Sequence, residues 1–488
     1  MSKLEFITKN DLIPIFPEII ILITAFTILI VDLFDTKRER SFTLALTSIL
    51  GLLLAAISEA HLYGKNISGF YGTIIADDFS ILFELIYLSV TIITIFVSLN
   101  YIKEHEINFG EYYVLLLTSV SGMMFLTSSL DLILIFIGLE VMSISSYILV
   151  GMQRKIAISN EAALKYLLLG AFSTGFLLYG ISLLYGATGS TIIPIIISEI
   201  QNNGATNPLI ISGVSLIIIA MSFKIAIVPF HMWTPDVYTG APTPITGFLS
   251  GAAKAAVFSV FIRIFMTGIS LEGENWENLF WILAVLTMTV GNIMALLQSE
   301  VKRMLAFSSI AHAGYIMVAV VVGSSSAISG IIFYSLAYGF MGTGAFGILT
   351  IKDAGRIPKT FEDLGGYGRR NPLLAFLMTL FIFSLIGLPL TGGFIGKFQI
   401  FSSALKEGWI WLTIIGILNS ALSVYYYLRV LMFMYMREGA LPEGSKLSSN
   451  SSKFALVGLL GTAFAVVYLG IFPDKFLELA TSSIIAML

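Results

Sequence analysis

Lysine, arginine and glutamate side chains inside long apolar stretches are the residues of this chain that could do chemistry. Placing a charge at the centre of a bilayer costs at least ~2.5 kcal/mol, so residues of this kind usually have a function. Lys224, Lys254 and Lys397 have apolar residues on both sides and are predicted to lie deepest. Among the acidic residues, Glu140 is predicted to be the most deeply placed and Glu84 the next. Three further cations fall within predicted spans: Lys165, Arg263 and Arg429.

The chemistry that buried lysines and glutamates permit is proton transfer. Burial disfavours the charged form of either group, so each can bind or release a proton near neutral pH. A carboxylate beside Lys224 would hold the ammonium form, and removing that carboxylate would favour release of the proton. A series of such groups, bridged by water, could carry protons across a membrane. For Lys254 the alternative is a structural role, hydrogen-bonded to backbone carbonyls, and for Glu140 it is a structural ion pair with a lysine.

The histidines and the cysteine count limit the other chemistries. The chain has four histidines, at positions 61, 105, 231 and 312, and no cysteine. These histidines are too widely spaced for a metal cluster, and the lack of cysteine excludes disulfides, thiolate metal sites and iron–sulfur ligation in this chain. We therefore predict no metal site. For His312, a packed core histidine and a proton relay fit the sequence equally well.

The composition identifies a membrane protein. The chain has 488 residues, of which 57% are hydrophobic and 12% are charged. A soluble protein carries roughly 25% charged residues, and half that share cannot cover a body of this size, so a soluble enzyme is excluded. The net charge is −3, with no basic tail or patch that would indicate nucleic-acid binding. The N-terminus lacks the compact pattern of a cleaved signal, and we expect it to be retained.

Apolar stretches separated by polar breaks predict an all-α polytopic membrane protein with about fourteen transmembrane helices. Lysine and arginine residues in the loops gather on the face opposite the N-terminus, sixteen against five. By the positive-inside rule that face is cytoplasmic, and both termini lie on the outer side. The predicted spans cover residues 12–33, 41–61, 79–100, 111–129, 131–150, 162–186, 208–229, 242–268, 277–298, 303–323, 327–350, 373–400, 408–436 and 453–472.

Two of the deep lysines lie beside predicted helix breaks. Lys224 precedes Pro229 by five residues, and Lys397 follows a stretch rich in glycine that also contains Pro389. Interrupted apolar segments of this kind are typical of inverted-repeat transporters. We predict two inverted five-helix repeats, spans 4–8 and 9–13, with broken spans 7 and 12 at matching positions. The predicted divisions are an N-terminal three-helix segment (1–110), the first repeat (111–268), the second repeat (269–436) and a C-terminal helix with its tail (437–488).

Four segments of the sequence carry a family resemblance. They are EAALKYLLLGAFSTGFLLYGISLLYGATGS (161–190), FKIAIVPFHMWTPDVYTGAPTPITGFLSGAAKAA (223–256), VKRMLAFSSIAHAGY (301–315) and GLPLTGGFIGKF (387–398). With them, almost the whole chain resembles subunit N of the proton-pumping NADH–quinone oxidoreductases (respiratory complex I), in the antiporter-like family shared with Mrp cation/proton antiporters. GFIGKF favours subunit N, because subunit M typically carries a glutamate where Lys397 stands.

The resemblance implies a role for each charged position. Glu140 matches the fifth-helix glutamate that pairs with the seventh-helix lysine, here Lys224. Lys254 matches the central lysine, and Lys397 the twelfth-helix residue nearest the exit. Positions thought to assist this hydrophilic axis align with Lys165, His231 and His312. The resemblance also implies that this subunit holds no cofactor, and that NADH, flavin (FMN), iron–sulfur clusters and quinone bind to other subunits.

The resemblance further implies where the chain works and with what. We expect it in the inner (plasma) membrane of a prokaryote, beside other membrane subunits of complex I, including further antiporter-like ones. An Mrp-type cation/proton antiporter subunit is the main alternative, and it would operate without NADH. A membrane scaffold in which the buried charges only fix packing is the third.

Overall fold

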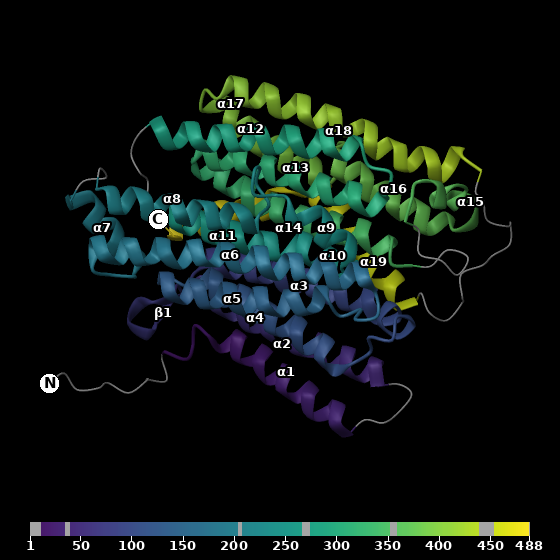
Figure 1. Ribbon diagram of the computed structural model, residues 1–488, viewed down its shortest axis with the longest axis horizontal. Coiled ribbons are helices and arrows are strands. Elements are labelled where there is room, and N and C mark those ends of the chain that lie inside the picture. The colour runs from purple at the N-terminus through teal and green to yellow at the C-terminus, as the bar shows by residue number, and fades with distance from the viewer. Residues whose placement is uncertain are drawn as a thin grey trace.

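The computed structural model of the protein describes residues 11–34, 40–203, 207–265, 274–351, 359–438 and 453–487. Within these ranges the chain is a bundle of long helices that lie side by side (Figure 1). A small antiparallel sheet pairs β1 (Ile67–Gly69) with β2 (Ile74–Ala76). The prediction of an all-α polytopic membrane fold is therefore confirmed.

The helices follow the predicted order along the chain. The N-terminal segment contains α1 (Phe16–Phe34), α2 (Arg40–Leu62) and α3 (Asp78–Glu104). Next come α4 (Gly110–Ser128), α5 (Leu132–Val150), α6 (Ala157–Thr188), α7 (Ile193–Asn203), α8 (Pro208–Lys224), α9 (Trp233–Gly240), α10 (Thr243–Phe248) and α11 (Lys254–Phe265). The second half contains α12 (Glu274–Leu296), α13 (Val301–Val322), α14 (Ser325–Ile348), α15 (Tyr367–Arg370), α16 (Pro372–Ile386), α17 (Gly392–Lys406) and α18 (Ile410–Met436), and the chain closes with α19 (Lys453–Ile471) and α20 (Asp474–Met487).

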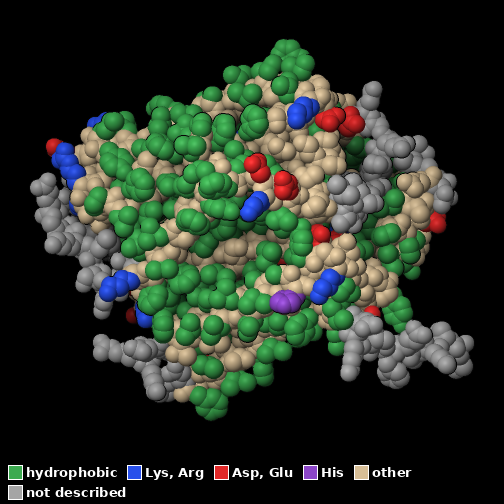
Figure 2. Space-filling model, turned by 180° about the vertical axis from the view of Figure 1, so that it is seen from behind, with side chains coloured by type: hydrophobic (Ala, Val, Ile, Leu, Met, Phe, Trp, Pro, Cys, Tyr) green, Lys and Arg blue, Asp and Glu red, His purple; other side chains and the backbone are tan. Residues whose placement is uncertain are grey.

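The outer surface of the bundle is apolar, as a lipid environment requires. Hydrophobic side chains cover most of the face seen in Figure 2, with few charged ones among them. Within the described residues, eleven helices are long and apolar enough to cross a membrane. The three other predicted spans coincide with α4, with α8, and with α16 and α17 together. A break was expected in the predicted spans 208–229 and 373–400. Helix α8 is shorter than the first of these spans, and the second is divided into α16 and α17.

The first break begins earlier than Pro229. Helix α8 ends at Lys224, and α9 starts only at Trp233. Proline lacks the backbone donor and keeps the preceding residue out of the helical region, so the chain has to leave the helix ahead of it. It does so through Ala226, which adopts a positive φ of 61°. The deep lysine therefore stands at the very end of a half-helix.

The second break separates α16 from α17. Gly387 ends α16 with a φ of 90°, the left-handed conformation that glycine adopts without strain. Past the break, the Gly393 amide donates to the Ser384 hydroxyl over 3.1 Å. A Cβ at Gly393 would overlap the Ser384 carbonyl oxygen, so the two half-helices approach closely only because this residue is glycine. Lys397 follows one turn later.

Gly393→Ala is expected to destabilise the protein by about 1–3 kcal/mol, because the overlapping atom belongs to the backbone and the half-helices must move apart. The measurement is the thermal midpoint of the purified protein in detergent. Gly461→Ala is the matched control, because a Cβ there would meet nothing within 4 Å. An unchanged midpoint for Gly393→Ala would contradict the close packing of the second break.

A π-helical turn interrupts the predicted span 242–268, which we expected to be continuous. The turn covers Leu249–Ala253 and is followed directly by α11, which begins at Lys254. A Cβ at Gly251 would lie 3.1 Å from the Cα of Gly339, so small residues bring this turn against α14. Single π-turns often mark functional positions. Lys224 and Lys254 therefore lie directly at irregular points of their helices, and Lys397 lies about one turn after the second break.

The start of α1 and the end of α20 lie toward the same end of the bundle, where β1 and α7 also lie, while α15 is at the opposite end (Figure 1). Some of the loop lysines and arginines from which the orientation was predicted lie outside the described residues. They are Lys3, Lys9, Lys37, Arg38, Lys352, Arg356 and Lys446.

Candidate functional site

Hydroxyl groups of α5 hold the Lys224 ammonium at the end of α8. Its Nζ donates to the Ser143 hydroxyl over 2.8 Å and to the Tyr147 hydroxyl over 3.1 Å, and the lysine is buried. Tyr147 reaches this position by packing over Gly170 of α6, where a Cβ would overlap the tyrosine hydroxyl. The site is therefore built by three helices, α5, α6 and α8.

Glu140 lies one turn away from these hydroxyls and is not in contact with the lysine. Its carboxylate accepts a hydrogen bond of 2.7 Å from the Thr174 hydroxyl of α6. Among the described residues, no ion pair joins Glu140 to Lys224. Glu140 and Ser143 are three residues apart and so share one face of α5, separated by roughly 4.5 Å along the axis. The lysine could reach the carboxylate by shifting about one turn.

Lys254 is buried at the centre of the molecule. Its Nζ donates to the Ser309 carbonyl over 2.8 Å and to the Ser309 hydroxyl over 2.5 Å. The ammonium lies 5.9 Å from the centre of the Tyr238 ring, a distance at which a cation is attracted by the aromatic face. A cavity of about 10 Å³, room for about one water, is lined by Lys254, Ser309 and His312 among others.

His312 of α13 lies between two tyrosines. Its Nδ1 is joined by a hydrogen bond of 2.5 Å to the Tyr334 hydroxyl of α14, and its Nε2 by one of 2.9 Å to the Tyr427 hydroxyl of α18. The Tyr427 hydroxyl also bonds to Ser308. A ring with both nitrogens bonded to hydroxyls can take a proton on one side and release one on the other. A packed core histidine with both nitrogens satisfied would show the same contacts, so this geometry fits both interpretations that the sequence left open.

Lys397 closes the series at the second break. Its Nζ donates to the carbonyls of Leu385 and Ile386, over 3.0 and 2.9 Å, and to the Ser420 hydroxyl over 3.0 Å. These carbonyls are the free C-terminal end of α16, where a positive charge is favoured. The ammonium also lies 4.8 Å from the centre of the Tyr315 ring. In the described part of the chain, no carboxylate forms an ion pair with Lys397, Lys254 or Lys224.

Lys165 lies at the rim of the protein and not on the buried series. Its Nζ forms ion pairs with Glu161 and Asp236, over 2.7 and 2.8 Å, and its side chain is 41% exposed. Arg303 of α13 pairs with the other oxygen of Asp236 over 2.8 Å. These residues line a polar cleft with Glu300, at the end of α6 and α9. Asp236 thus connects helices of both predicted repeats.

His231 lies in the first break, between α8 and α9, and is half-buried. Within the described residues no hydrogen bond joins it to Lys224, Lys254 or Lys397. Of the seven candidates, the structure thus brings Lys254 and His312 to one cavity and buries Lys224 and Lys397. Glu140, predicted to be the most deeply placed acid, is only half-buried, whereas Glu84 is 3% exposed. Lys165 and His231 lie outside this arrangement.

The sequence did not single out the hydroxyl groups that hold the lysines. Serines and tyrosines are common in apolar helices, so their presence carries little information. One signal exists on α5: Ser143 and Tyr147 follow Glu140 by three and seven residues, which is the spacing of one helical face. The missed residues are Ser143, Tyr147, Thr174, Ser309, Tyr334, Ser420, Tyr427, Asp236 and Arg303.

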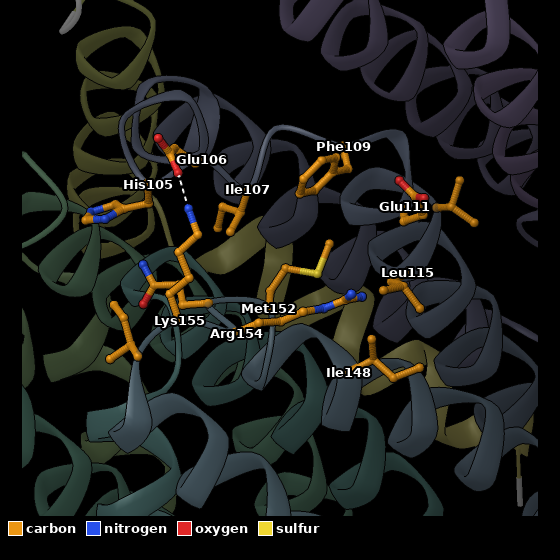
Figure 3. A pocket seen from close by; sticks show the side chains of 13 residues that line it. His105, Glu106, Ile107, Phe109, Glu111, Leu115, Ile148, Met152, Arg154 and Lys155 are labelled. Atoms are coloured by element: carbon orange, nitrogen blue, oxygen red, sulfur yellow. Dashed lines mark hydrogen bonds and ion pairs between the residues drawn. The ribbon is translucent and has the colours of Figure 1, made fainter.

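A surface pocket lies at one end of α3, α4 and α5 (Figure 3). Within it, Lys155 donates to the Glu106 carboxylate over 2.7 Å. This hydrogen bond lowers the pKa of the exposed Glu106 carboxyl and raises the pKa of Lys155. Both side chains are largely exposed, at 75% and 87% for Glu106 and Lys155, so solvent screens their interaction. None of the residues that line this pocket is one of the seven candidate residues.

Lys155→Ala is expected to leave proton transport and assembly unchanged, because an exposed ion pair contributes little. The measurement is proton uptake by membrane vesicles that contain the variant. A clear loss of transport would mean that the surface pocket takes part in function, and that the buried series is not sufficient.

The family model described as NADH:quinone oxidoreductase/Mrp antiporter, transmembrane region, matches residues 129–423. The chain belongs to this family. The matched segment starts at the end of α4 and ends within α18, so it contains every one of the seven candidate residues. Family membership thus rests on the same part of the chain as the site.

Relatives of the family match almost the whole chain. NADH-quinone oxidoreductase subunit N of Trichlorobacter lovleyi is 44% identical over 472 residues, which cover 96% of each chain. A chain of respiratory complex I from Thermus thermophilus is 31% identical and superposes with a TM-score of 0.79, covering 95% of this chain and 99% of that one. A chain of the Mrp complex from a Dietzia species shares the fold at 19% identity, with a TM-score of 0.81 and 97% coverage of both chains.

Proposed function

We propose that this chain is the proton-translocating membrane subunit, subunit N, of an NADH–quinone oxidoreductase. Electron transfer from NADH to quinone would take place in other subunits and would be coupled to proton movement here. The observation that carries the proposal is the row of three buried ammonium groups, each held by neutral oxygens and none by a carboxylate. A carboxylate partner would stabilise the charged ammonium form and so keep the proton on the lysine. Neutral oxygen partners hold the ammonium group and leave the proton easier to release. The near-complete match to subunit N relatives supports the same function.

Within this proposal the residues have different roles. Lys224 receives a proton near the first break, Lys254 passes it at the centre, and Lys397 releases it at the second break. His312 lies in the cavity beside Lys254, and its two tyrosine contacts provide the step toward the second half. Water bridging these groups would complete the path. His231 remains a weaker candidate, because no contact connects it to the lysines.

Glu140 acts in the proposal as the switch on Lys224. The lysine now bonds to Ser143 and Tyr147, and Glu140 to Thr174, an arrangement with the charges apart. Closing the pair would hold the proton on Lys224, and opening it would release the proton to the next group. Chemistry at the quinone site in a neighbouring subunit would drive this change.

The polar cleft at the rim is proposed as the route by which protons reach the series. Lys165, Asp236 and Arg303 line it at the end of α6 and α9, on the face to which the loop cations are predicted to point. That face would be cytoplasmic and both termini would lie on the outer side of the inner membrane of a bacterium. The start of α1 and the end of α20 lie toward one end of the bundle, which supports placing both on the same side of the membrane (Figure 1).

The architecture proposed for this function has fourteen spans. The eleven long helices, together with α4, the α8–α9 segment and the α16–α17 segment, make up that number. The breaks after Lys224 and before Lys397 support inverted five-helix repeats at 111–268 and 269–436. Residues 1–110 and 437–488 would flank them as the N-terminal three-helix segment and the C-terminal helix with its tail.

Gentle extraction of the tagged chain from its native membrane tests the proposal. We expect flavin- and iron–sulfur-bearing subunits to co-purify with NADH–quinone activity, along with further antiporter-like membrane subunits. Recovery with small Mrp-like membrane partners and no redox chromophore would favour a cation/proton antiporter instead. The shared fold of the Mrp chain makes this the relevant second outcome.

A further inference from the structure

Three buried glutamates lie outside the two predicted repeats, in the N-terminal three-helix segment. Glu18 of α1, Glu59 of α2 and Glu84 of α3 are 0%, 1% and 3% exposed. Both carboxyl oxygens of Glu18, and one each of Glu59 and Glu84, are buried without a hydrogen-bond partner in the described structure. An ionised carboxylate in such a place is very costly, whereas a protonated carboxyl group is tolerated.

The three carboxyl groups lie close enough to interact. Glu18 is near the start of α1, Glu59 near the end of α2 and Glu84 in the second turn of α3, so all three lie toward the same end of the bundle. Glu59 and Glu84 interact with each other, and Glu18 interacts electrostatically with both. Two carboxyl groups in hydrogen-bonding contact must hold a proton between them, because two negative oxygens repel.

The ligand that fits this cluster is a proton. No group of three or more histidine, cysteine, aspartate or glutamate side chains in the described ranges is arranged to hold a metal ion. The other titratable groups around the cluster do not neutralise it. Asp77 is a further acid, and its carboxylate forms an ion pair with Arg263 over 2.9 and 3.0 Å. Tyr87 is an uncharged neighbour on α3.

Three hydroxyl groups lie between α3, which carries Glu84, and α11, which carries Lys254. Tyr87 lies one turn beyond Glu84 on α3, and its hydroxyl is 2.8 Å from the Thr127 hydroxyl and 3.2 Å from the Ser259 hydroxyl. Thr127 and Ser259 are 2.8 Å apart, so the three hydroxyls form a closed triangle. Ser259 is on α11, five residues or roughly 7.5 Å from Lys254. Hydroxyl groups in contact can pass a proton along their hydrogen bonds.

We propose that Glu18, Glu59 and Glu84 form a second proton-binding site, which exchanges protons with Lys254 through the hydroxyls of Tyr87, Thr127 and Ser259. In the exchange, an ammonium proton leaves Lys254 as a carboxylate of the cluster becomes a carboxylic acid, and the lysine becomes a neutral amine. The coupling to Lys254 rests on the proposed function, whereas proton binding by the cluster does not.

Infrared difference spectroscopy of the purified complex tests proton binding. Spectra recorded at acidic and alkaline pH are compared between the wild type and Glu84→Gln, with Glu59→Gln as a second variant should the first not assemble. We expect the wild type to show a carbonyl band of a protonated carboxylic acid, lowered in frequency in heavy water, that the variants lose. The exposed Glu407 provides the matched control, Glu407→Gln, which should keep the band. Identical carboxylic acid bands in the wild type and the cluster variants would overturn the site.

Tyr87→Phe tests the connection to Lys254, because it removes the hydroxyl and keeps the ring. We expect this variant to keep the carboxylic acid band and to move fewer protons per NADH oxidised in membrane vesicles. Normal pumping by Tyr87→Phe would overturn the exchange with Lys254. Normal pumping by Lys224→Ala would instead contradict the main relay, and the infrared band would still report on the cluster.

Discussion

Lys224→Ala is expected to cut proton pumping strongly while the complex still assembles. The substitution removes the one titratable group at the end of α8 and leaves a gap lined by the Ser143 and Tyr147 hydroxyls. Moving a charge across an unsolvated gap at mid-membrane adds at least ~2.5 kcal/mol, which slows the step by roughly 70-fold. Leaving the Ser143 and Tyr147 hydroxyls without a partner lowers the free energy of unfolding by about 1–3 kcal/mol each, a loss that a bundle of this size tolerates. The measurement is the number of protons pumped per NADH oxidised in membrane vesicles.

Two companion variants make this result specific. Lys224→Arg keeps a positive charge that does not release its proton, so pumping should stay impaired if proton exchange matters and recover if only charge matters. Lys155→Ala is the matched surface control. Normal pumping by an assembled Lys224→Ala complex would contradict the relay.

The sequence predicted the broad architecture well because that depends on hydropathy. Long apolar runs and their breaks are properties of contiguous residues, so each predicted span coincides with one or two of the observed helices. The shorter helices α7, α9 and α15, and the C-terminal α20, lie outside the predicted spans. The second break was predicted correctly from its glycines and proline. The first begins at Lys224 and not at Pro229, because the conformational restriction of proline extends back along the chain.

The contacts of the deep lysines could not be predicted in the same way. Lys224 and Ser143 are 81 residues apart, and their contact depends on how α5 packs against α8. The resemblance implied a Glu140–Lys224 pair, whereas the structure holds the two apart on separate hydroxyls, and whether they pair during turnover stays a prediction. The π-turn before Lys254 was also missed, because small residues permit a close approach without specifying the extra residue in the turn.

Arg263 shows how burial can differ from a hydropathy-based expectation. Arg263 is near the end of its predicted span, where a long cationic side chain commonly extends to the membrane surface, yet its side chain is 2% exposed. It forms a two-pronged pair with Asp77, over 2.9 and 3.0 Å, and links α11 to the start of α3. Asp77 also accepts from the Ser80 amide as the N-cap of α3. The pair therefore joins the N-terminal segment to the first proposed repeat.

Arg263→Met is expected to destabilise the protein by about 3–5 kcal/mol, because it leaves the Asp77 carboxylate buried without its partner. The double variant Arg263→Met with Asp77→Asn should recover most of this loss. Asparagine removes the charge and still caps α3, and methionine fills the space of the arginine stem. The measurement is the thermal midpoint and yield of the purified protein for both single variants and the double. If the double variant were as unstable as Arg263→Met alone, the destabilisation would come from lost packing, and the buried charge would not be its cause.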